Sequence, residues 1–208
     1  MHACTAVRRR GAVFHTDHSP NKLNRRSFLG LGAVAAAAAL SPLSAEARSI
    51  SGAASPKAPV RTLSFFNTHT GERLRTTYCE AGSYDAGALK EINYILRDFR
   101  VDEVKPIDPK LLDLLHELSG TLETDRPFHI ISGYRSPHTN QMLRQRGGET
   151  TGVATRSLHM VGKAIDIRLP GVKLDHLRGA ARSLQLGGVG YYPSSNFVHV
   201  DTGRVRFW

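Results

Sequence analysis

Two histidines and one aspartate in the last third of the chain have the residue types of a metal site. His159 and Asp166 lie in the segment Ser157–Asp166, and His199 follows in Phe197–Asp201. Two imidazoles and one carboxylate form a three-ligand zinc set that leaves a coordination position for water. A structural zinc site more often has four protein ligands, commonly thiolates, and no cysteine is close in sequence. The set therefore predicts a hydrolytic zinc site.

The spacing of these residues indicates separate elements. Six residues separate His159 from Asp166, which on one helix would place them about two turns apart. Gly162 instead indicates a turn, with Asp166 on the strand that follows and facing away from its isoleucine neighbours. His199 lies between two valines on another strand and faces away from them in the same way. A chain with 10 histidines also offers chance trios, so spacing alone does not separate a zinc site from coincidence.

Two further side chains, those of Arg135 and Asp201, could take part in hydrolysis beside the predicted zinc ligands. Arg135 lies at a strand-to-helix turn, and its planar guanidinium suits a substrate carboxylate or a developing oxyanion. A structural ion pair is the alternative for Arg135. Asp201 lies two residues after His199 on the same strand face, so it could be the general base or orient a ligand histidine. His138 is a further candidate, for which a surface or capping role is favoured.

The elements that must position these residues mix strands and helices. Alternating or apolar runs predict strands, and helical periodicity behind aspartate, serine and proline start signals predicts helices. The expected strands are 62–66 and 73–78 as a hairpin, then 128–132, 164–169, 189–192 and 197–201. The expected helices are 85–99, one that begins at Pro109, 137–146 and 174–184. Several strands follow one another without crossover helices, which predicts an α+β fold with a central, mainly antiparallel sheet and flanking helices.

The N-terminal part of the chain resembles an export signal. Arg25 and Arg26 precede an apolar run over residues 29–40, and small residues at 45–47 suit a cleavage site. The arginine pair indicates the twin-arginine route to the periplasm, and the run is short for a transmembrane helix. An uncleaved anchor is the alternative. We therefore expect a signal over 1–47, a Ser-, Ala- and Pro-rich linker over 48–60, and a zinc peptidase domain over 61–208.

The net charge and composition of the chain indicate which classes of partner it can bind. Removal of residues 1–47 lowers the formal charge from +10 to +6, and a basic exported protein is attracted to anionic polymers. Peptide stems of the cell wall carry free carboxylates and fit this description, whereas no nucleic-acid motif accompanies the charge. Cys79 is the one cysteine after residue 47, so that part can form no internal disulfide, and Cys79 is expected in the core.

Several motifs, in order, resemble those of a known peptidase superfamily. The pattern of Ser157–Asp166 is similar to the metal signature of the D-Ala-D-Ala metallopeptidases, whose superfamily includes lysostaphin and the hedgehog signalling domain. Residues 132–136 resemble the substrate-arginine segment of that family. Residues 187–193 and 197–203 resemble its murein endopeptidase branch, once catalogued as a domain of unknown function. The resemblance covers roughly residues 60–208.

The resemblance implies a fold, a metal set and a substrate. It implies a central antiparallel sheet, zinc bound by His159, Asp166 and His199, and hydrolysis of peptide cross-links in peptidoglycan. From the substrate-arginine segment, the residues expected to bind substrate are Ser132, Tyr134 and Arg135.

One departure from the family pattern concerns the general base. Many relatives have an acidic residue three positions before the last ligand, or a histidine two before it. Here Asn196 and Phe197 occupy these positions, and neither can accept the proton of the attacking water. Asp201 is therefore our candidate base, chosen from its place on the strand rather than from the family.

Three functions remain open from the sequence. The first is a zinc-dependent murein endopeptidase that cleaves cross-links between peptide stems. The second is a D,D-carboxypeptidase that trims D-Ala from single stems. The third is a non-catalytic wall-binding module that retains a metal for stability, which the unmatched base position motivates. The sequence does not choose an oligomeric state, and it predicts no stable membrane insertion after processing.

Overall fold

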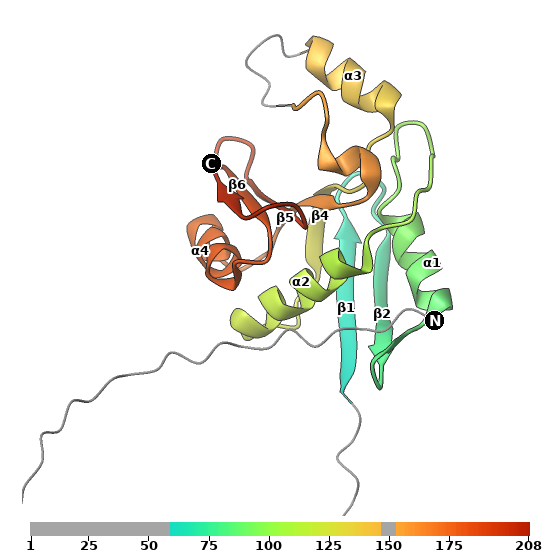
Figure 1. Cartoon of the computed structure of the whole chain (residues 1–208), viewed down its shortest axis with the longest axis vertical. Coiled ribbons are helices and arrows are strands. Elements are labelled where there is room, and N and C mark those ends of the chain that lie inside the picture. Colours follow the sequence, from blue (N-terminus) through green and yellow to red (C-terminus); the bar gives the residue numbers. More distant parts are fainter. Residues whose placement is uncertain (1–58, 147–152) are drawn as a thin grey trace, which may run out of the picture. The chain divides into compact units, whose positions relative to one another are not determined.

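The computed structural model describes residues 59–146 and 153–208, which form one sheet and its flanking helices (Figure 1). The predicted signal, 1–47, and most of the predicted linker, 48–60, lie outside these residues, so both stay predictions. The first strand begins at Val60, next to the expected start of the domain. No helix within the two described ranges has the length and apolar character needed to cross a membrane.

The sheet has eight strands in the order β3-β2-β1-β4-β5-β7-β6-β8. Five pairings are antiparallel, and two, β1 with β4 and β6 with β8, are parallel. The α+β class is confirmed, with a mixed sheet that is mostly antiparallel, whereas the closer likeness to the D-Ala-D-Ala peptidase fold stays a prediction. The strands are β1 (Val60–Asn67), β2 (Arg73–Glu80), β3 (Ser83–Tyr84), β4 (Phe128–Ser132), β5 (Ala164–Arg168), β6 (Gly188–Tyr192), β7 (Phe197–Asp201) and β8 (Arg206–Phe207).

Local capping starts three of the four α-helices in the described ranges. The side chains of Asp85, Asp108 and Ser136 accept hydrogen bonds from backbone N–H groups of the first turns. Pro109 and Pro137 occupy first positions, where a missing N–H costs nothing. The helices are α1 (Ala86–Ile95), α2 (Pro109–Thr121), α3 (Pro137–Arg146) and α4 (Leu174–Leu184).

Helix α1 ends four residues before the predicted end at Phe99. The carbonyl of Ile95 accepts a hydrogen bond from the Asn67 side chain at 3.0 Å, and the carbonyl of Leu96 accepts one from the Tyr134 N–H at 2.8 Å. These long-range contacts satisfy the backbone where a longer helix would have used its own N–H groups. The correction thus comes from tertiary structure, which helical periodicity does not report.

The central strands divide their side chains between two environments. Every second residue of β5 and β7 is fully buried and belongs to the hydrophobic core, namely Ile165, Ile167, Val198 and Val200. Helices α2 and α4 pack against each other and against the sheet on this apolar side (Figure 1). Because neighbouring residues of a strand face opposite ways, Asp166 and His199 lie on the other side of the sheet.

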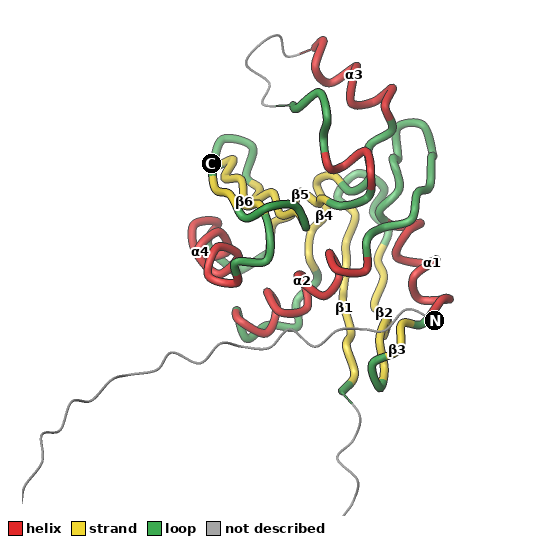
Figure 2. Tube along the Cα trace, in the orientation of Figure 1, coloured by secondary structure: helices red, strands yellow, loops and turns green. Residues whose placement is uncertain are grey.

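Loops gather around the upper ends of β1, β2 and β4 in Figure 2. The Asp108 N–H donates to the Gly162 carbonyl at 2.9 Å, which joins the start of α2 to the turn before β5. The Arg135 N–H donates to the His159 carbonyl at 3.3 Å. These bonds hold segments that are far apart in sequence beside the central strands.

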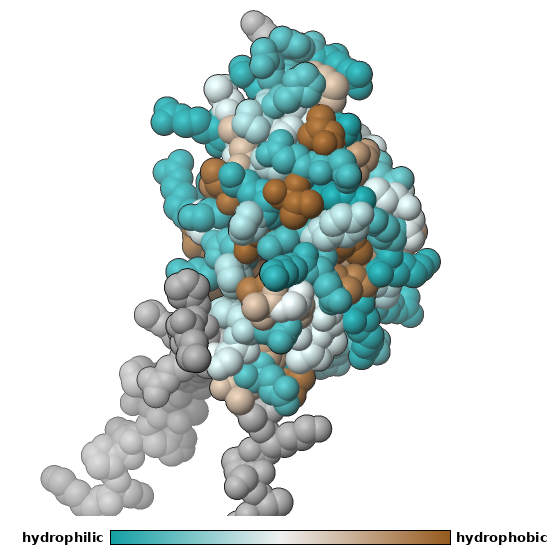
Figure 3. Space-filling model, turned by 90° about the vertical axis from the view of Figure 1, so that its right-hand side faces the viewer, coloured by the Kyte–Doolittle hydropathy of each residue, from teal (hydrophilic) through white to brown (hydrophobic). Residues whose placement is uncertain are grey.

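Most of the surface visible in Figure 3 is hydrophilic, with apolar side chains scattered over it. Isolated apolar residues are normal on a protein surface and indicate no partner. One exposed aromatic residue, Trp208, differs because it adjoins the polar side of the central strands, as the next section describes.

Candidate metal centre

A row of residues crosses the sheet on its polar side. In the strand register, Asp166 of β5 is paired with Ser132 of β4 and with His199 of β7, and His199 is paired with Gly190 of β6. Directly opposite residues on neighbouring strands hold their side chains side by side. Register therefore brings two of the three predicted ligands together.

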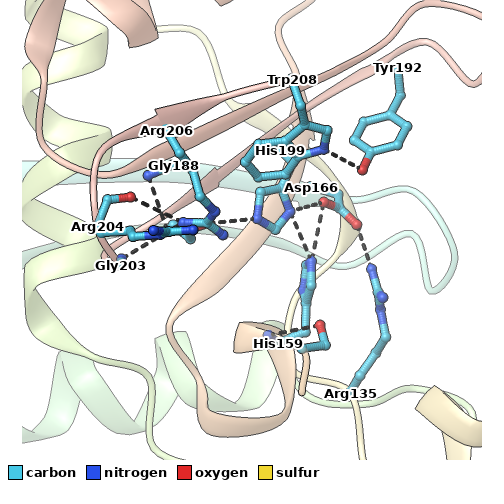
Figure 4. Close-up of polar contacts among 12 residues, drawn as sticks. Arg135, His159, Asp166, Gly188, Tyr192, His199, Gly203, Arg204, Arg206 and Trp208 are labelled. Atoms are coloured by element: carbon cyan, nitrogen blue, oxygen red, sulfur yellow. Dashed lines mark hydrogen bonds and ion pairs between the residues drawn. The ribbon is translucent and has the colours of Figure 1, made fainter. Parts of the chain in front are cut away.

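The third predicted ligand arrives from a short 3-10 helix, η2 (Leu158–Val161). Ser157 caps it, and Gly162 ends it with φ of 67°, a left-handed conformation that favours glycine. A side chain at Gly162 would also collide with the Pro106 carbonyl. The turn directs His159 back over the start of β5 toward Asp166 (Figure 4).

Three potential ligand atoms converge at this point. His159 Nε2 lies 3.2 Å from Asp166 Oδ1 and 3.2 Å from His199 Nδ1, and His199 Nδ1 lies 2.8 Å from Asp166 Oδ1. Ligands of a tetrahedral zinc ion at ordinary bond lengths are ~3.3 Å apart. The three side chains are almost fully buried. Within the described ranges, these residues form the one group of three or more acidic, histidine or cysteine side chains close enough for a shared ion.

The outer nitrogen of each histidine has an acceptor of its own. His159 Nδ1 donates to the Gly133 carbonyl at 2.7 Å, and His199 Nε2 donates to Asp201 Oδ2 at 3.1 Å. A carbonyl or carboxylate oxygen can only accept, so these bonds assign the tautomers and turn the inner lone pairs toward Asp166. Such outer contacts are the usual support of metal-ligating histidines. Two lone pairs and a carboxylate directed at one point fit a divalent cation.

The second oxygen of Asp166 is bound by the predicted arginine. Arg135 Nη2 donates to Asp166 Oδ2 at 2.6 Å, and Arg135 Nε donates to Ser132 Oγ at 2.9 Å. The ion pair that was the alternative role for Arg135 is thus present, and Ser132 orients the guanidinium. Burial opposes the charge of Asp166, yet charge and hydrogen bonds from the two histidines hold the pKa of Asp166 well below its usual range.

The pKa values of the two histidines are shifted in opposite directions. Burial lowers the pKa of His159, and the nearby Arg135 adds to the effect. Burial also opposes protonation of His199, but its hydrogen bonds to Asp166 and Asp201 leave its pKa raised. A metal ion and a proton compete for the inner nitrogen of each histidine, and the raised pKa of His199 strengthens this competition there.

Asp201 lies behind His199 and does not line the cavity described below. Its carboxylate is fully buried and accepts bonds from Arg206 Nη2 at 2.7 Å and from the N–H groups of Gly188 and Gly203 at 3.1 and 2.8 Å. Burial would raise the pKa of Asp201, but the bonds from His199, Arg206 and Gly203 lower it. Both roles predicted for Asp201, general base and orientation of a ligand histidine, stay predictions.

A cavity of about 140 Å³ opens over the three converging atoms. Its lining is basic, with Arg135, Arg156 and Arg206, and Asp166 is the one carboxylate among the described residues that line it. Tyr192, Phe197 and Trp208 form an aromatic side beside His199. The cavity therefore offers cations and apolar rings next to the candidate metal centre.

The other predicted residues lie outside this cavity. Tyr134 is buried, and its hydroxyl donates to Glu103 Oε1 at 2.6 Å; burial and this bond raise its pKa to about 12. These contacts are structural, and a substrate-binding role for Tyr134 or Ser132 stays a prediction. His138 is exposed on α3, and Cys79 is a buried free thiol, as expected from the sequence.

Sequence reasoning missed Arg156, Arg206 and Trp208. Arg156 follows the six residues 147–152 that lie outside the description, in a loop that was read only as polar. Arg206 and Trp208 follow the last predicted strand, where β8 is too short to show alternation. The sequence signal that could have identified Trp208 is that it is the single tryptophan of the chain.

A buried set of two histidines and one aspartate beneath a polar cavity is the arrangement of a metal-dependent hydrolase. Comparison with known proteins agrees with this class. The family model described as peptidoglycan L,D-endopeptidase MepK, from the M15 peptidases, matches residues 55–208. The chain belongs to this family, within the D-Ala-D-Ala metallopeptidase superfamily, so the resemblance seen in the sequence is confirmed.

Individual relatives match along most of their length. The peptidoglycan L,D-endopeptidase MepK of Escherichia coli K12 is 44% identical over 185 residues, which are 89% of this chain and 97% of the relative. A protein of Haemophilus influenzae Rd described as probable peptidoglycan L,D-endopeptidase MepK is 41% identical over 186 residues, 89% of this chain and 95% of the relative. The family is metal-dependent, and the three converging residues provide a possible site for the ion.

Proposed function

We propose that this protein is a zinc-dependent endopeptidase that hydrolyses L,D-peptide cross-links of peptidoglycan in the periplasm. Family membership supports the reaction and the substrate, because the matched relatives are named for both. The observation that carries the metal part is the convergence of two histidine lone pairs and the Asp166 carboxylate, with both outer histidine nitrogens already bonded.

His159, Asp166 and His199 would hold the ion. A zinc ion in such a site supplies a Lewis acid that activates water and polarises a carbonyl. Zinc is favoured over magnesium or calcium because imidazole nitrogens dominate the donor set. The buried position of the three side chains keeps their geometry fixed and limits the water that competes for them.

Arg135 is proposed to act on substrate as well as on Asp166. Two of its nitrogens hold Ser132 and Asp166, and the side chain lines the cavity, so its donors are pre-oriented beside the reacting centre. A fixed guanidinium in a buried position stabilises developing negative charge without reorganisation. Arg135 would thus bind the carbonyl oxygen of the scissile bond or a neighbouring carboxylate.

Asp201 is proposed to orient His199, and the contacts favour this role over general base. Its oxygens already accept bonds from an imidazole, a guanidinium and two backbone amides, and it is fully buried. A base must reach the attacking water directly or through one other water molecule. Arg206 would in turn hold Asp201 in place.

The basic lining of the cavity supports an anionic peptide substrate. Arg156 is exposed at the rim, and peptide stems of the wall carry free carboxylates. Export by the twin-arginine route, processing near residue 47 and residence in the periplasm remain part of the proposal. They are supported by the residues of the N-terminal segment and by a substrate that lies outside the cytoplasm.

The decisive experiment is digestion of purified cross-linked muropeptides by the purified full chain, with product masses as the readout. We expect dimers to give monomers, a chelator to stop the reaction and added zinc to restore it. Release of free D-Ala alone would favour the carboxypeptidase alternative. Zinc-loaded protein that binds wall fragments without turnover would favour the non-catalytic module.

A further inference from the structure

Trp208 has an exposed ring that the structure nevertheless holds in one place. The residue is 46% exposed, although it is large and apolar. Its backbone continues the ladder between β8 and β6, with Trp208 N–H donating to the Val189 carbonyl and Tyr191 N–H donating to the Trp208 carbonyl, at 3.2 and 3.0 Å.

The indole itself has three further contacts. Its Nε1 donates to the Tyr192 hydroxyl at 2.8 Å, and the Arg206 guanidinium lies 4.8 Å from its ring centroid. The ring packs over Gly190, where an added Cβ would come within 2.7 Å of the indole. Glycine at this position thus makes room for the ring, and the neighbouring side chains fix its orientation.

This ring stands next to the candidate metal centre. The centroids of the Trp208 and His199 rings are 5.4 Å apart, and both side chains line the cavity (Figure 4). Tyr192 and Phe197 stack with centroids 4.6 Å apart and extend the aromatic side. The indole thus forms one side of the cavity through which a scissile bond would reach the three converging atoms.

We propose that the Trp208 indole is a specificity-determining wall that binds the aliphatic side chain of the residue next to the scissile bond. This inference rests on the proposed function and assigns a binding role to a residue outside the metal set. The exposed part of an indole offers apolar contact area at low cost in conformational entropy. When a methyl or methylene group packs on the indole, apolar surface of both groups is removed from water, which favours binding.

The arrangement of the charges agrees with a peptide rather than a sugar as the occupant. Arg135 and Arg156 line the same cavity and suit the carboxylates of a peptide. The ring also lies beside a metal ligand, whereas a glycan strand would be farther from the bond that is cleaved. Sugars remain an outcome that the test distinguishes.

Kinetics of four variants with muropeptide dimers test the proposal. For Trp208→Ala we expect a KM about tenfold higher with little change in kcat, because the loss is of apolar burial rather than of reacting groups. Trp208→Phe should recover most of the loss. Gly190→Ala should reproduce the defect, since it displaces the ring without removing it. Phe207→Ala is the matched control, because Phe207 is the aromatic residue next to Trp208 in sequence, is 37% exposed and does not line the cavity.

Fluorescence gives a readout that is independent of turnover, because Trp208 is the single tryptophan of the chain. Uncross-linked peptide stems, the products of the proposed reaction, should change the emission of zinc-loaded wild-type protein in a saturable way. The response should weaken in Gly190→Ala and persist in Phe207→Ala. Zinc content and the melting temperature of each variant show whether the fold and the metal centre are intact.

Two results would overturn the inference. One is an unchanged KM and unchanged stem affinity in Trp208→Ala and Gly190→Ala with normal zinc content. The other is an emission change with a peptide-free disaccharide of the glycan strand and none with the stems. If wild-type protein hydrolyses no dimer but its emission responds to stems, the wall is supported and the proposed reaction fails.

Discussion

Two buried carboxylates in this protein have opposite surroundings. Asp113 of α2 accepts hydrogen bonds from three donors: the hydroxyls of Tyr78 and Tyr84 at 3.0 and 2.7 Å, and the Arg61 guanidinium at 2.6 Å. These donors come from β1, β2 and β3, so Asp113 ties three strands to one helix. Its hydrogen-bonding needs are met within the protein.

Asp166 is met by one donor and two histidine lone pairs. Arg135 binds its outer oxygen, while its inner oxygen faces imidazole nitrogens whose partners hold them as acceptors. Three acceptors at one point repel each other unless a metal ion or a proton lies between them. The difference teaches how to read a buried carboxylate: donors on every side indicate a structural role, and converging acceptors indicate a metal centre.

The strongest test of this comparison is the same isosteric change at both positions. Asp166→Asn removes the charge from the metal set, and we expect activity to fall by more than the roughly 10–100-fold loss that follows loss of an outer partner. Zinc per protein molecule, measured by elemental analysis after dialysis, should fall with it. Full zinc content and normal activity in this variant would contradict the assigned ligand set.

A smaller effect is expected at Asp201, which contacts the candidate ligand His199 on its outer nitrogen. Asp201→Asn keeps the shape of the side chain but weakens its bonds to His199 and Arg206, so zinc affinity should fall by about 10–100-fold. Competition with a chromophoric chelator measures this affinity. At saturating zinc the variant should regain most of its kcat, because the side chain orients a ligand and does not take a proton. Loss of kcat that persists at saturating zinc would instead identify Asp201 as the general base.

The matched change at the structural carboxylate should affect stability and leave the metal in place. Asp113→Asn weakens a charge-assisted bond to Arg61 and unbalances two tyrosine hydroxyls, which we expect to cost about 2 kcal/mol in the free energy of unfolding. Urea denaturation of zinc-loaded protein measures this loss. Zinc stoichiometry and the KM of the folded variant should match the wild type. Reduced zinc content would contradict a purely structural role for Asp113.

The smallest effect is expected at the rim of the cavity. Arg156 is exposed, so its attraction to a substrate carboxylate is worth about 0.2–1 kcal/mol and Arg156→Ala should raise KM up to about fivefold. The effect should diminish with added salt, because exposed charges are screened. Steady-state kinetics at low and high ionic strength provide the measurement, with Arg204→Ala as a control, since Arg204 does not line the cavity. Equal effects in the two variants would assign the change to net charge.

Local signals predicted most of the elements well. Helices α3 and α4 and strands β4 and β7 have the bounds expected from capping, proline and alternation. Strands β3 and β8 were missed because two residues are too few to show a period. The end of α1 was wrong because carbonyls near it bond to Asn67 and Tyr134, both distant in sequence.

The candidate site also has a part that the sequence predicted and a part that only long-range contacts decided. Residue types and strand alternation named His159, Asp166 and His199, and the structure brings all three together. Which nitrogen of each histidine faces inward depended on the Gly133 carbonyl and on Asp201, and no local pattern reports such contacts. At the two positions where many relatives have the general base, this chain has Asn196 and Phe197, and neither can take that role. Phe197 contributes instead to the aromatic side of the cavity.

The sequence by itself determined the types of the candidate ligands, the strand face on which two of them lie and the family to which the chain belongs, because these depend on residue identity and short-range periodicity. Only the tertiary structure decided that Asp201 is bonded to the outer nitrogen of His199, that Arg135 is bound to Asp166 and that Trp208 lies beside His199. Strand register and loop packing bring together residues far apart in the chain, and the free energy that selects those pairings belongs to the whole fold.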